Sequence, residues 1–405
     1  MSTISKKQQE FLDWEMGVFF HFGIRTFYEG HKDWDMQEMP LQGFNPTELN
    51  CEQWIRTIKE AGAKYAILVC KHHDGFANWP SKYTDYSVKN TPWKDGNGDV
   101  VAEFVAACRK YDVKVGLYYS PAQFGSKDCD NKQYDDYFIN QIGELLTNYG
   151  KIDYLWFDGC GSEGHTYDTK RIIKAIRTMQ KDILIFNMWD PDTRWVGNEF
   201  GMAPWPLYNS VSSLNFSVLT EEKDKLAEER YLPAECDFKI RKHNWFYSEN
   251  DADMLMSLDE LVGRYYYTVG RGANFLVNIG PDRRGLLPEQ DCARFLEFGR
   301  EIQRRFANPL PASVQRKDKM LQITFDKEIL LDTLVLKEDL TKEPVVSRFT
   351  ITTYTDFGKP ITIFEGNTIG HKMICTFPTV ATKCLQVQLD QDSQMILDAA
   401  CFYTK

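Results

Sequence analysis

The stretch Ile152-Asp153-Tyr154-Leu155-Trp156-Phe157-Asp158-Gly159 is an apolar, aromatic-rich run that lies between Gly150 and Gly159. Such a run predicts a buried β-strand. The strand ends in Asp158, and a buried carboxylate is costly unless it is paired or faces a wet cavity. Two interpretations follow from this stretch alone: Asp158 caps the next turn, or it is a catalytic carboxylate.

The same apolar pattern recurs along the first 300 residues and alternates with amphipathic segments. The predicted strands cover residues 17–23, 65–70, 113–119, 152–158, 183–187, 231–235 and 274–278, and the predicted helices cover 51–62, 99–110, 134–149, 168–180, 257–268 and 288–302. Continuously apolar strands that alternate with helices are typical of a parallel sheet covered by helices. So many units favour a (β/α)8 TIM-like barrel over an open sheet. Residues 11–16 are expected to be a short lead-in, and the charge-dense stretch 221–230 a solvated helix.

The pattern changes after Ala307-Asn308-Pro309-Leu310-Pro311. From residue 319 onward, short runs alternate apolar and polar residues and are separated by turns such as Asp356-Phe357-Gly358. This pattern predicts an antiparallel β-sandwich. We therefore expect a catalytic α/β barrel over residues 1–310 and a C-terminal β-sandwich over residues 311–405.

Composition excludes several classes of function. The chain has 405 residues, a net charge of -10 and 43% hydrophobic residues, so neither nucleic acid nor an anionic membrane surface is an expected partner. No apolar run approaches membrane-spanning length, and the N-terminus shows no apolar region of a signal peptide. The 10 cysteines are scattered without a Cys-x-x-Cys pair, as in a reducing compartment. The chain is expected to be cytoplasmic.

Polar and aromatic residues recur where the predicted strands end, which is where a barrel of this kind places its active site. These residues are His21, His72, His73, Asp74, Tyr118, Tyr119, Trp156, Asp158, Asn187, Trp189, Asp190, Asn278 and Asp282. One such residue alone is explained by capping a turn. Their recurrence at equivalent positions favours an active site.

Metal and phosphate chemistry are weakly supported. His72 and His73 are adjacent, and adjacent residues on an extended strand point to opposite faces, so the pair is poorly placed to chelate one ion. Gly270-Arg271-Gly272 precedes a strand, whereas a phosphate-binding loop follows one. We expect no metal and no cofactor.

The carboxylates and aromatic residues that remain suit glycoside cleavage. That reaction needs two carboxyl groups, one as nucleophile or base and one as acid near the glycosidic oxygen. Asp158 is the first candidate. The second is Glu199, on a glycine-flanked loop beside aromatic residues, or Glu235, at a predicted strand end. Spacing alone does not separate Glu199 from Glu235.

Several motifs together resemble a known family. They are Gly17-Val18-Phe19-Phe20-His21-Phe22-Gly23, Lys71-His72-His73-Asp74-Gly75-Phe76, Leu117-Tyr118-Tyr119-Ser120-Pro121, Leu155-Trp156-Phe157-Asp158-Gly159, Arg194-Trp195-Val196-Gly197-Asn198-Glu199, and Gly270-Arg271-Gly272-Ala273-Asn274 continuing to Asn278-Ile279-Gly280-Pro281-Asp282-Arg283-Arg284-Gly285. The chain resembles the α-L-fucosidases of glycoside hydrolase family 29 along the whole predicted barrel.

The resemblance implies a retaining mechanism that releases terminal α-L-fucose from fucosylated oligosaccharides or glycans. Asp158 would be the nucleophile that forms a covalent fucosyl-enzyme, and a second carboxyl group would be the acid/base. The other residues that match the family's fucose pocket are His21, Trp34, His72, His73, Tyr119, Trp156 and Trp245. The C-terminal region is similar to a discoidin-like, carbohydrate-binding sandwich.

The segment around Glu199 is similar to the subfamily that prefers α-1,3/1,4-linked fucose in Lewis-type structures. Two residues depart from the family pattern: Asp33 stands where a Glu is usual, and Phe200 stands where relatives often have a second Glu. Two alternatives remain beside the fucosidase hypothesis. One is a non-catalytic fucose-binding protein, and the other is a related barrel glycosidase that acts on a different sugar.

Overall fold

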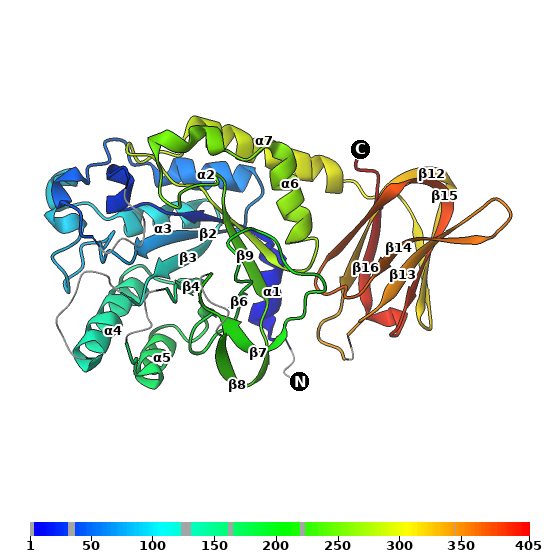
Figure 1. The fold of residues 1–405 in the computed structure, drawn as a ribbon, viewed down its shortest axis with the longest axis horizontal. Helices are drawn as coiled ribbons and strands as arrows, with labels where there is room; N and C mark the ends of the chain where they lie inside the picture. The colour runs from blue at the N-terminus through cyan, green and yellow to red at the C-terminus, as the bar shows by residue number, and fades with distance from the viewer. Residues whose placement is uncertain (1–3, 31–36, 123–130, 161–164, 219–222, 344) are drawn as a thin grey trace.

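The computed structural model describes every residue except 1–3, 31–36, 123–130, 161–164, 219–222 and 344. Its centre is a parallel sheet of eight strands in the order β5-β4-β3-β2-β1-β10-β9-β6. The strands are β1 Met16–Phe20, β2 Tyr65–Lys71, β3 Lys114–Tyr119, β4 Tyr154–Phe157, β5 Leu184–Phe186, β6 Arg194–Trp195, β9 Ala234–Lys239 and β10 Asn274–Asn278. A parallel bridge between Phe186 and Thr193 brings the two edge strands together. The predicted barrel is therefore confirmed as a nearly closed one (Figure 1).

Helices surround this barrel, as their apolar faces require. They are α2 Cys51–Glu60, α3 Val100–Lys110, α4 Asn131–Asn148, α5 Thr169–Met179, α6 Leu258–Tyr267 and α7 Glu289–Phe306. The expected lead-in is wrong: α1, Lys6–Trp14, precedes β1, and Ser5 and Gln8 form its capping box. Short 3₁₀ helices lie in the loops as η1 Ile24–Phe27, η2 Leu41–Gly43, η3 Val88–Asn90, η4 Trp93–Gly96, η5 Glu249–Met254 and η6 Ser393–Met395.

The barrel departs from a regular alternation of strand and helix after β5. Only residues 187–193 connect β5 to β6, and a β-hairpin of β7 Ser210–Asn215 and β8 Lys223–Tyr231 stands between β6 and β9. The prediction of a helix over 221–230 is therefore wrong for the described residues from 223 onward. Charged residues of high helix propensity lie in β8, but they have no apolar stripe to bury, and pairing with β7 satisfies their backbone instead.

Successive residues of the barrel strands face opposite sides. Tyr118 and Trp156 point into the barrel, where they join an aromatic cluster with Phe19 and Phe186. Their neighbours point outward into the core between strands and helices, as Tyr119 does. Because both faces are buried, strands such as β1 and β4 are apolar or aromatic throughout, and their two faces look alike in the sequence.

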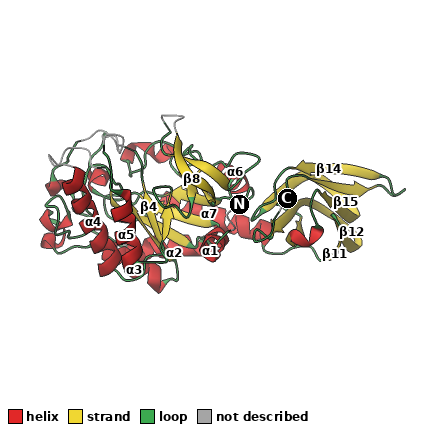
Figure 2. Ribbon diagram, turned by 90° about the horizontal axis from the view of Figure 1, so that it is seen from below, coloured by secondary structure: helices red, strands yellow, loops and turns green. Residues whose placement is uncertain are grey.

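An antiparallel sheet of six strands follows the barrel, and Figures 1 and 2 show it beyond the end of α7. Its strands are β11 Ser313–Lys317, β12 Met320–Glu338, β13 Phe349–Tyr354, β14 Pro360–Gly366, β15 Met373–Leu389 and β16 Ile396–Phe402. The long strands β12 and β15 change register twice along their pairing, and the sheet has a hydrophobic core of its own. Val335, Ile374 and Phe402 instead join the core of the barrel's outer layer. Among the described residues, no helix is long and apolar enough to cross a membrane.

Candidate active site

Asp158 lies directly after β4, at the carboxyl end of the barrel. Its Oδ2 accepts a hydrogen bond from the Tyr118 hydroxyl at 2.8 Å, and its Oδ1 accepts one from the backbone N–H of Cys160 at 2.9 Å. The side chain is 25% exposed. These two hydrogen bonds therefore fix the orientation of the carboxylate, while part of the side chain stays accessible to a ligand.

His73 is the charge partner of Asp158. Its Nε2 lies 3.4 Å from Asp158 Oδ2, and its Nδ1 lies 2.6 Å from Ser120 Oγ. The Ser120 hydroxyl donates to the carbonyl of Ala122 at 2.9 Å, so its oxygen is left to accept from Nδ1. Both ring nitrogens of His73 then act as donors, which requires the imidazolium form.

Electrostatics agrees with this assignment. Burial disfavours a charge on His73, but the Asp158 carboxylate outweighs it and raises the pKa of His73 to about 10. Burial alone would raise the pKa of Asp158, whereas His73 and the hydrogen bonds to the carboxylate bring that pKa below its usual value. Asp158 is therefore an ionised carboxylate at neutral pH.

The other two histidines are neutral. Burial lowers the pKa of His21 to about 3, and burial lowers that of His72 well below its usual value. The Nδ1 of His21 lies 2.8 Å from Asn278 Oδ1, and Asn278 Nδ2 donates to the carbonyl of Trp245, which fixes the amide. His21 therefore donates through Nδ1, and its Nε2 is an acceptor. The Nδ1 of His72 is buried and has no hydrogen-bond partner among the described residues.

The expectation that His72 and His73 point to opposite faces is wrong. His72 and His73 do not point to opposite faces, because β2 ends at Lys71 after a register shift that begins at Val69, and both residues lie beyond the extended segment. Their ring centroids are 4.3 Å apart. One ligand atom each from His72, His73 and Asp158 lies within 4.8 Å of the others, a grouping able to hold a cation. A protonated His73 has no lone pair to offer such an ion, so the absence of a metal stays a prediction.

Aromatic rings line the barrel below Asp158. Trp156 is stacked between Phe186, at 4.1 Å, and Tyr118, at 5.4 Å. The Trp245 ring lies 4.9 Å from that of His21, tilted by 32°, and the Nζ of Lys239 lies over the Trp245 ring, 4.9 Å from its centroid. Trp156 and Trp245 therefore lie where the sequence placed them, beside the carboxylate and the histidines.

The structure places Tyr119 elsewhere. Its hydroxyl donates to Gln141 of α4 at 2.6 Å, its ring packs on Phe138, and the side chain is fully buried outside the barrel. The expectation that Tyr119 lines the pocket is wrong, because the alternation along β3 turns Tyr118 inward in its place. Trp34 and Asp33 fall outside the described residues.

Glu235 is buried inside the barrel. Its carboxylate accepts hydrogen bonds from Tyr65 at 2.6 Å, from Trp156 at 2.8 Å and from Tyr154 at 3.3 Å, and none of the residue is exposed. Burial raises its pKa to about 7. Asp237, two residues further along β9, accepts from the indole of Trp195 at 2.6 Å, and burial raises its pKa to about 7 as well.

Glu199 lies on the loop after β6, in a left-handed backbone conformation with φ 47°. Its side chain is 31% exposed, and its Oε2 is 3.9 Å from the Nζ of Lys239. Because Lys239 also contacts Trp245, whose ring lies 4.9 Å from that of His21, contacts connect Glu199 to the histidines of the site. Lys239, Ser120 and Asp237 were not predicted. The only feature of the sequence that could have pointed to these three residues is their position near the end of a strand.

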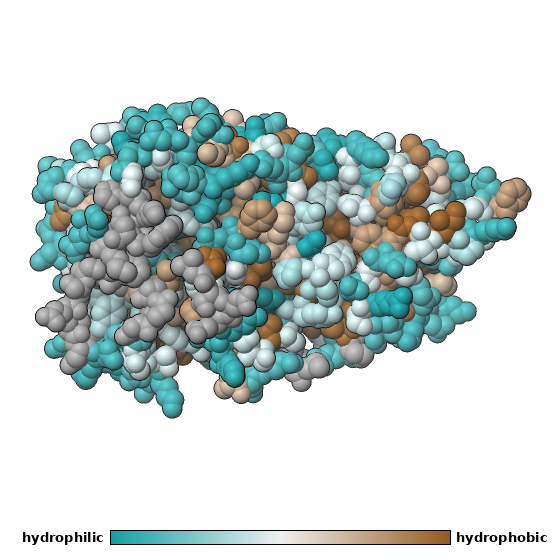
Figure 3. Space-filling view, in the orientation of Figure 1, coloured by the Kyte–Doolittle hydropathy of each residue, from teal (hydrophilic) through white to brown (hydrophobic). Residues whose placement is uncertain are grey.

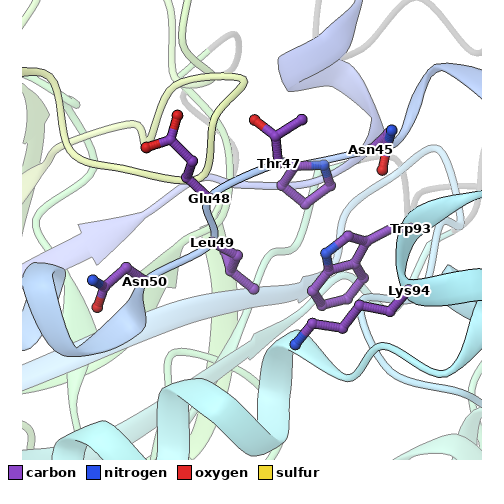
Figure 4. Close-up of a pocket in the computed structure, with 8 residues that line it drawn as sticks. Asn45, Thr47, Glu48, Leu49, Asn50, Trp93 and Lys94 are labelled. Carbon is purple, nitrogen blue, oxygen red and sulfur yellow. The ribbon is translucent and has the colours of Figure 1, made fainter.

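The structure also has a surface hollow unrelated to these residues. It has a volume of about 400 Å³ and lies where the loop before α2 meets η4 (Figure 4). Its lining residues are Asn45, Pro46, Thr47, Glu48, Leu49, Asn50, Trp93 and Lys94. None of them belongs to the group around Asp158.

Stability gives a first prediction, for Glu235→Gln. The amide cannot accept all three hydrogen bonds, so we expect the variant to lose about 1–3 kcal/mol of unfolding free energy. A carboxyl group whose folded pKa is raised stabilises the protein below its unfolded pKa of about 4.3, and that contribution is lost as the pH rises toward 7. Thermal unfolding of both proteins between pH 5 and 8 should show the wild type's advantage shrinking as the pH rises. An advantage that grows with pH would contradict a protonated Glu235.

Comparison with known proteins decides the family. The sequence matches the family described as α-L-fucosidase over residues 2–305, which is most of the chain. The chain belongs to the α-L-fucosidase family. It is 36% identical over 315 residues to α-L-fucosidase 1 of Arabidopsis thaliana, covering 74% of this chain and 60% of that protein. It is 28% identical over 269 residues to the tissue α-L-fucosidase of Mus musculus, covering 62% and 54%. The match thus spans less than two thirds of each of these relatives.

A solved structure confirms that the fold is that of an α-L-fucosidase family member. A glycoside hydrolase 29 family member from an unknown rumen bacterium superposes with a TM-score of 0.88 at 31% identity, covering 100% of this chain and 78% of that one. The likeness therefore includes both the barrel and the C-terminal sheet.

Proposed function

We propose that this α-L-fucosidase family member hydrolyses terminal α-L-fucose from fucosylated oligosaccharides or glycans, by a retaining mechanism. The observation that carries the proposal is the state of Asp158. It is an ionised, partly exposed carboxylate at the end of β4, between the His73 imidazolium and the Tyr118 hydroxyl. A carboxylate kept charged and open at a barrel's carboxyl end suits attack on an anomeric carbon.

In the proposed first step, an Asp158 oxygen forms a bond to the anomeric carbon of fucose, and the bond to the leaving oxygen breaks. Glu199 gives that oxygen a proton. In the second step water loses a proton to Glu199 and attacks the same carbon, so Asp158 is released. Two inversions at one carbon leave the configuration of fucose unchanged. The positive charge on His73 keeps Asp158 ionised in the free enzyme.

Exposure supports Glu199 rather than Glu235 as the acid/base. A group that protonates a leaving oxygen must reach the ligand. Glu199 is on an open loop with 31% of its side chain exposed, whereas both oxygens of buried Glu235 are occupied by aromatic donors of the barrel. We assign Glu235 the role of holding Trp156 in place.

The remaining pocket suits a deoxy sugar. The Nε2 of neutral His21 is an acceptor for a hydroxyl group, and the neutral imidazole of His72 lies beside it, 5.8 Å away between centroids. Trp245 offers aromatic surface to the apolar methyl group of fucose, whereas the Trp156 ring is stacked between Phe186 and Tyr118. Trp34 is proposed as a further wall on the family resemblance.

The linkage preference follows from the segment around Glu199, and we propose α-1,3/1,4-linked, Lewis-type fucose. Incubation with α-1,2-, α-1,3-, α-1,4- and α-1,6-linked fucosides and with the matching galactosides tests both the sugar and the linkage. We expect fucose release from the α-1,3 and α-1,4 compounds. Galactose release without fucose would instead support a barrel glycosidase for another sugar, and a preference for α-1,2 or α-1,6 would overturn the linkage.

The two adjacent tyrosines of β3 give a matched pair of variants. Tyr118→Phe removes one donor to the Asp158 carboxylate, and hydrogen bonds to charged groups contribute about 1.5–3 kcal/mol, so kcat/KM should fall about 10- to 100-fold. The pKa of Asp158 should rise, so activity should be lost at a higher pH on the acid side. Tyr119→Phe should leave the pH profile unchanged, because Tyr119 bonds to Gln141. Equal effects of the two changes would contradict the assignment of faces.

Metal removal tests the grouping of His72, His73 and Asp158. Dialysis against a chelator should leave fucoside hydrolysis unchanged, because the His73 nitrogens are both engaged as donors. Loss of activity that Zn²⁺ restores would show that these residues hold a metal and that His73 is neutral.

A further inference from the structure

A strip of exposed aromatic rings and two arginines runs away from the loop of Glu199. We call it the aromatic–arginine strip, and it consists of Phe200, Arg264, Tyr267, Arg271 and Trp205. Phe200 follows Glu199 directly and is 56% exposed, while Tyr267 and Trp205 are 40% and 38% exposed. Large rings exposed in one group, rather than singly, mark a binding surface.

The members of the strip contact one another in sequence. The Arg264 guanidinium lies 4.1 Å from the Phe200 ring, and Tyr267 is three residues further along α6, on the same face. The Arg271 guanidinium lies 4.4 Å from the Tyr267 ring and 5.4 Å from that of Trp205. Trp205 then reaches Phe364 of β14, at 6.4 Å. The strip is therefore continuous from the Glu199 loop to the C-terminal sheet.

Figure 3 shows neutral and hydrophobic residues in the middle of the visible face, between the barrel and the C-terminal sheet. Phe364 is half-buried in β14. The surface is not closed by another element of this chain, because the rings of Phe200, Tyr267 and Trp205 stay exposed.

Neither arginine of the strip forms an ion pair with a carboxylate in the described part of the chain. Arg264 is 8% exposed, its Nε is buried without an acceptor, and within the described ranges its side chain forms no hydrogen bond or ion pair. The nearest acid on its helix, Glu260, is bound to Lys242 at 2.5 Å. Arg271 donates to the carbonyl of Ala203 and forms no ion pair with a described residue. An arginine has five N–H donors, so both side chains keep donors available for a ligand.

This combination fits sugars. The apolar face of a pyranose ring packs on an aromatic ring, and the hydroxyl groups at its edge accept hydrogen bonds from a guanidinium. The strip starts at the residue after Glu199, the proposed donor to the leaving oxygen, so it lies on the leaving-group side of the scissile bond. Glu199 also contacts the residues proposed to bind fucose, because the Nζ of Lys239 lies 3.9 Å from Glu199 Oε2 and 4.9 Å from the Trp245 ring, and neither Lys239 nor Trp245 belongs to the strip.

We propose that the aromatic–arginine strip binds the leaving-group part of an extended oligosaccharide, beyond the sugar that carries fucose. This inference rests on the proposed function and names its substrate class: oligosaccharides of several residues rather than fucosyl disaccharides. Phe200, which replaces the second Glu common in relatives, then acts as a residue that determines specificity. Trp205 and Phe364 extend the same surface onto the C-terminal sheet.

Substrate length provides the test. The kcat/KM of Trp205→Ala and of Phe200→Ala is measured on a fucosyl disaccharide and on a longer oligosaccharide with the same fucose linkage. Each change should reduce kcat/KM on the longer substrate about 5- to 10-fold and leave the disaccharide unchanged, because an aromatic contact of this kind is lost only with the longer chain. Phe357→Ala is the matched control, because Phe357 is 93% exposed in the turn between β13 and β14, outside the strip.

Binding of the product oligosaccharide, which lacks fucose, provides a readout that needs no catalysis. Titration calorimetry should show wild-type binding that weakens by the same factor in Trp205→Ala. Three results would each contradict the proposal that the strip binds the oligosaccharide: equal losses of kcat/KM on both substrates, no loss on the longer substrate, or no binding of the product. A wild type that releases no fucose from either substrate contradicts the proposed function, while the titration still decides whether the strip binds sugar.

Discussion

Asp158→Gly is expected to reduce kcat for fucoside hydrolysis by at least about 10³-fold, because it removes the carboxylate that we propose forms the covalent intermediate. The loss should appear in kcat rather than in KM alone, since the substitution leaves the proposed sugar-binding residues His21, His72 and Trp245 unchanged. The variant should fold, because Asp158 is partly exposed and its neighbours Phe157 and Trp156 keep their packing. Steady-state kinetics with a thermal unfolding control measures the effect.

Rescue by azide tests whether Asp158 is the nucleophile. In Asp158→Gly, azide fits the space of the carboxylate and attacks once, so an activated fucoside should yield fucosyl azide of inverted configuration. Fucoside binding that persists without turnover would agree with this role. A wild-type protein that binds fucosides and never turns them over would instead support the fucose-binding alternative.

Glu199→Ala is expected to have the second largest effect. Removing the proposed general acid should lower kcat about 10²- to 10⁴-fold on a substrate with a poor leaving group. A fucoside with an activated leaving group needs less protonation, so the first step should be nearly normal and the second step slow. Comparing the two substrates separates these steps.

The rescue product has the opposite stereochemistry in this variant. Azide attacks the fucosyl-enzyme after Asp158 has acted, so the product should be fucosyl azide of retained configuration. Glu235→Ala is the matched control. It should lower stability, and azide should not rescue it. Rescue of the Glu235 variant in place of Glu199 would show that the acid/base assignment is wrong.

The barrel was predictable because its strands are buried on both faces. Runs such as Tyr65–Cys70 and Tyr154–Phe157 are apolar throughout, and helices with caps separate them. Burial on both faces also explains why the inward face of β3 was not predicted. Tyr118 and Tyr119 are both aromatic, so the sequence does not show which of them points into the barrel. The hairpin of β7 and β8 escaped prediction because its charged residues have high helix propensity and its pairing partner is distant in the sequence.

The sequence predicted individual residues of the site, but it did not predict the contacts between them. Asp158 and the histidines were found because polar groups follow apolar strands. The imidazolium state of His73 depends on Ser120 and Ala122, which lie on a different loop, and no sequence pattern contains that contact. The geometry of His72 and His73 depends on where β2 ends, and a strand boundary is the least certain part of a sequence-based prediction.

Covalent trapping tests the central claim most directly. A 2-deoxy-2-fluoro-fucosyl fluoride slows both steps and has a reactive leaving group, so the fucosyl-enzyme should accumulate and be visible by mass spectrometry. We predict one fluorofucosyl group per chain, on the peptide that contains Asp158, and no label on Asp158→Gly. A label on another residue, or fucose release by the wild type without any label, would contradict the account.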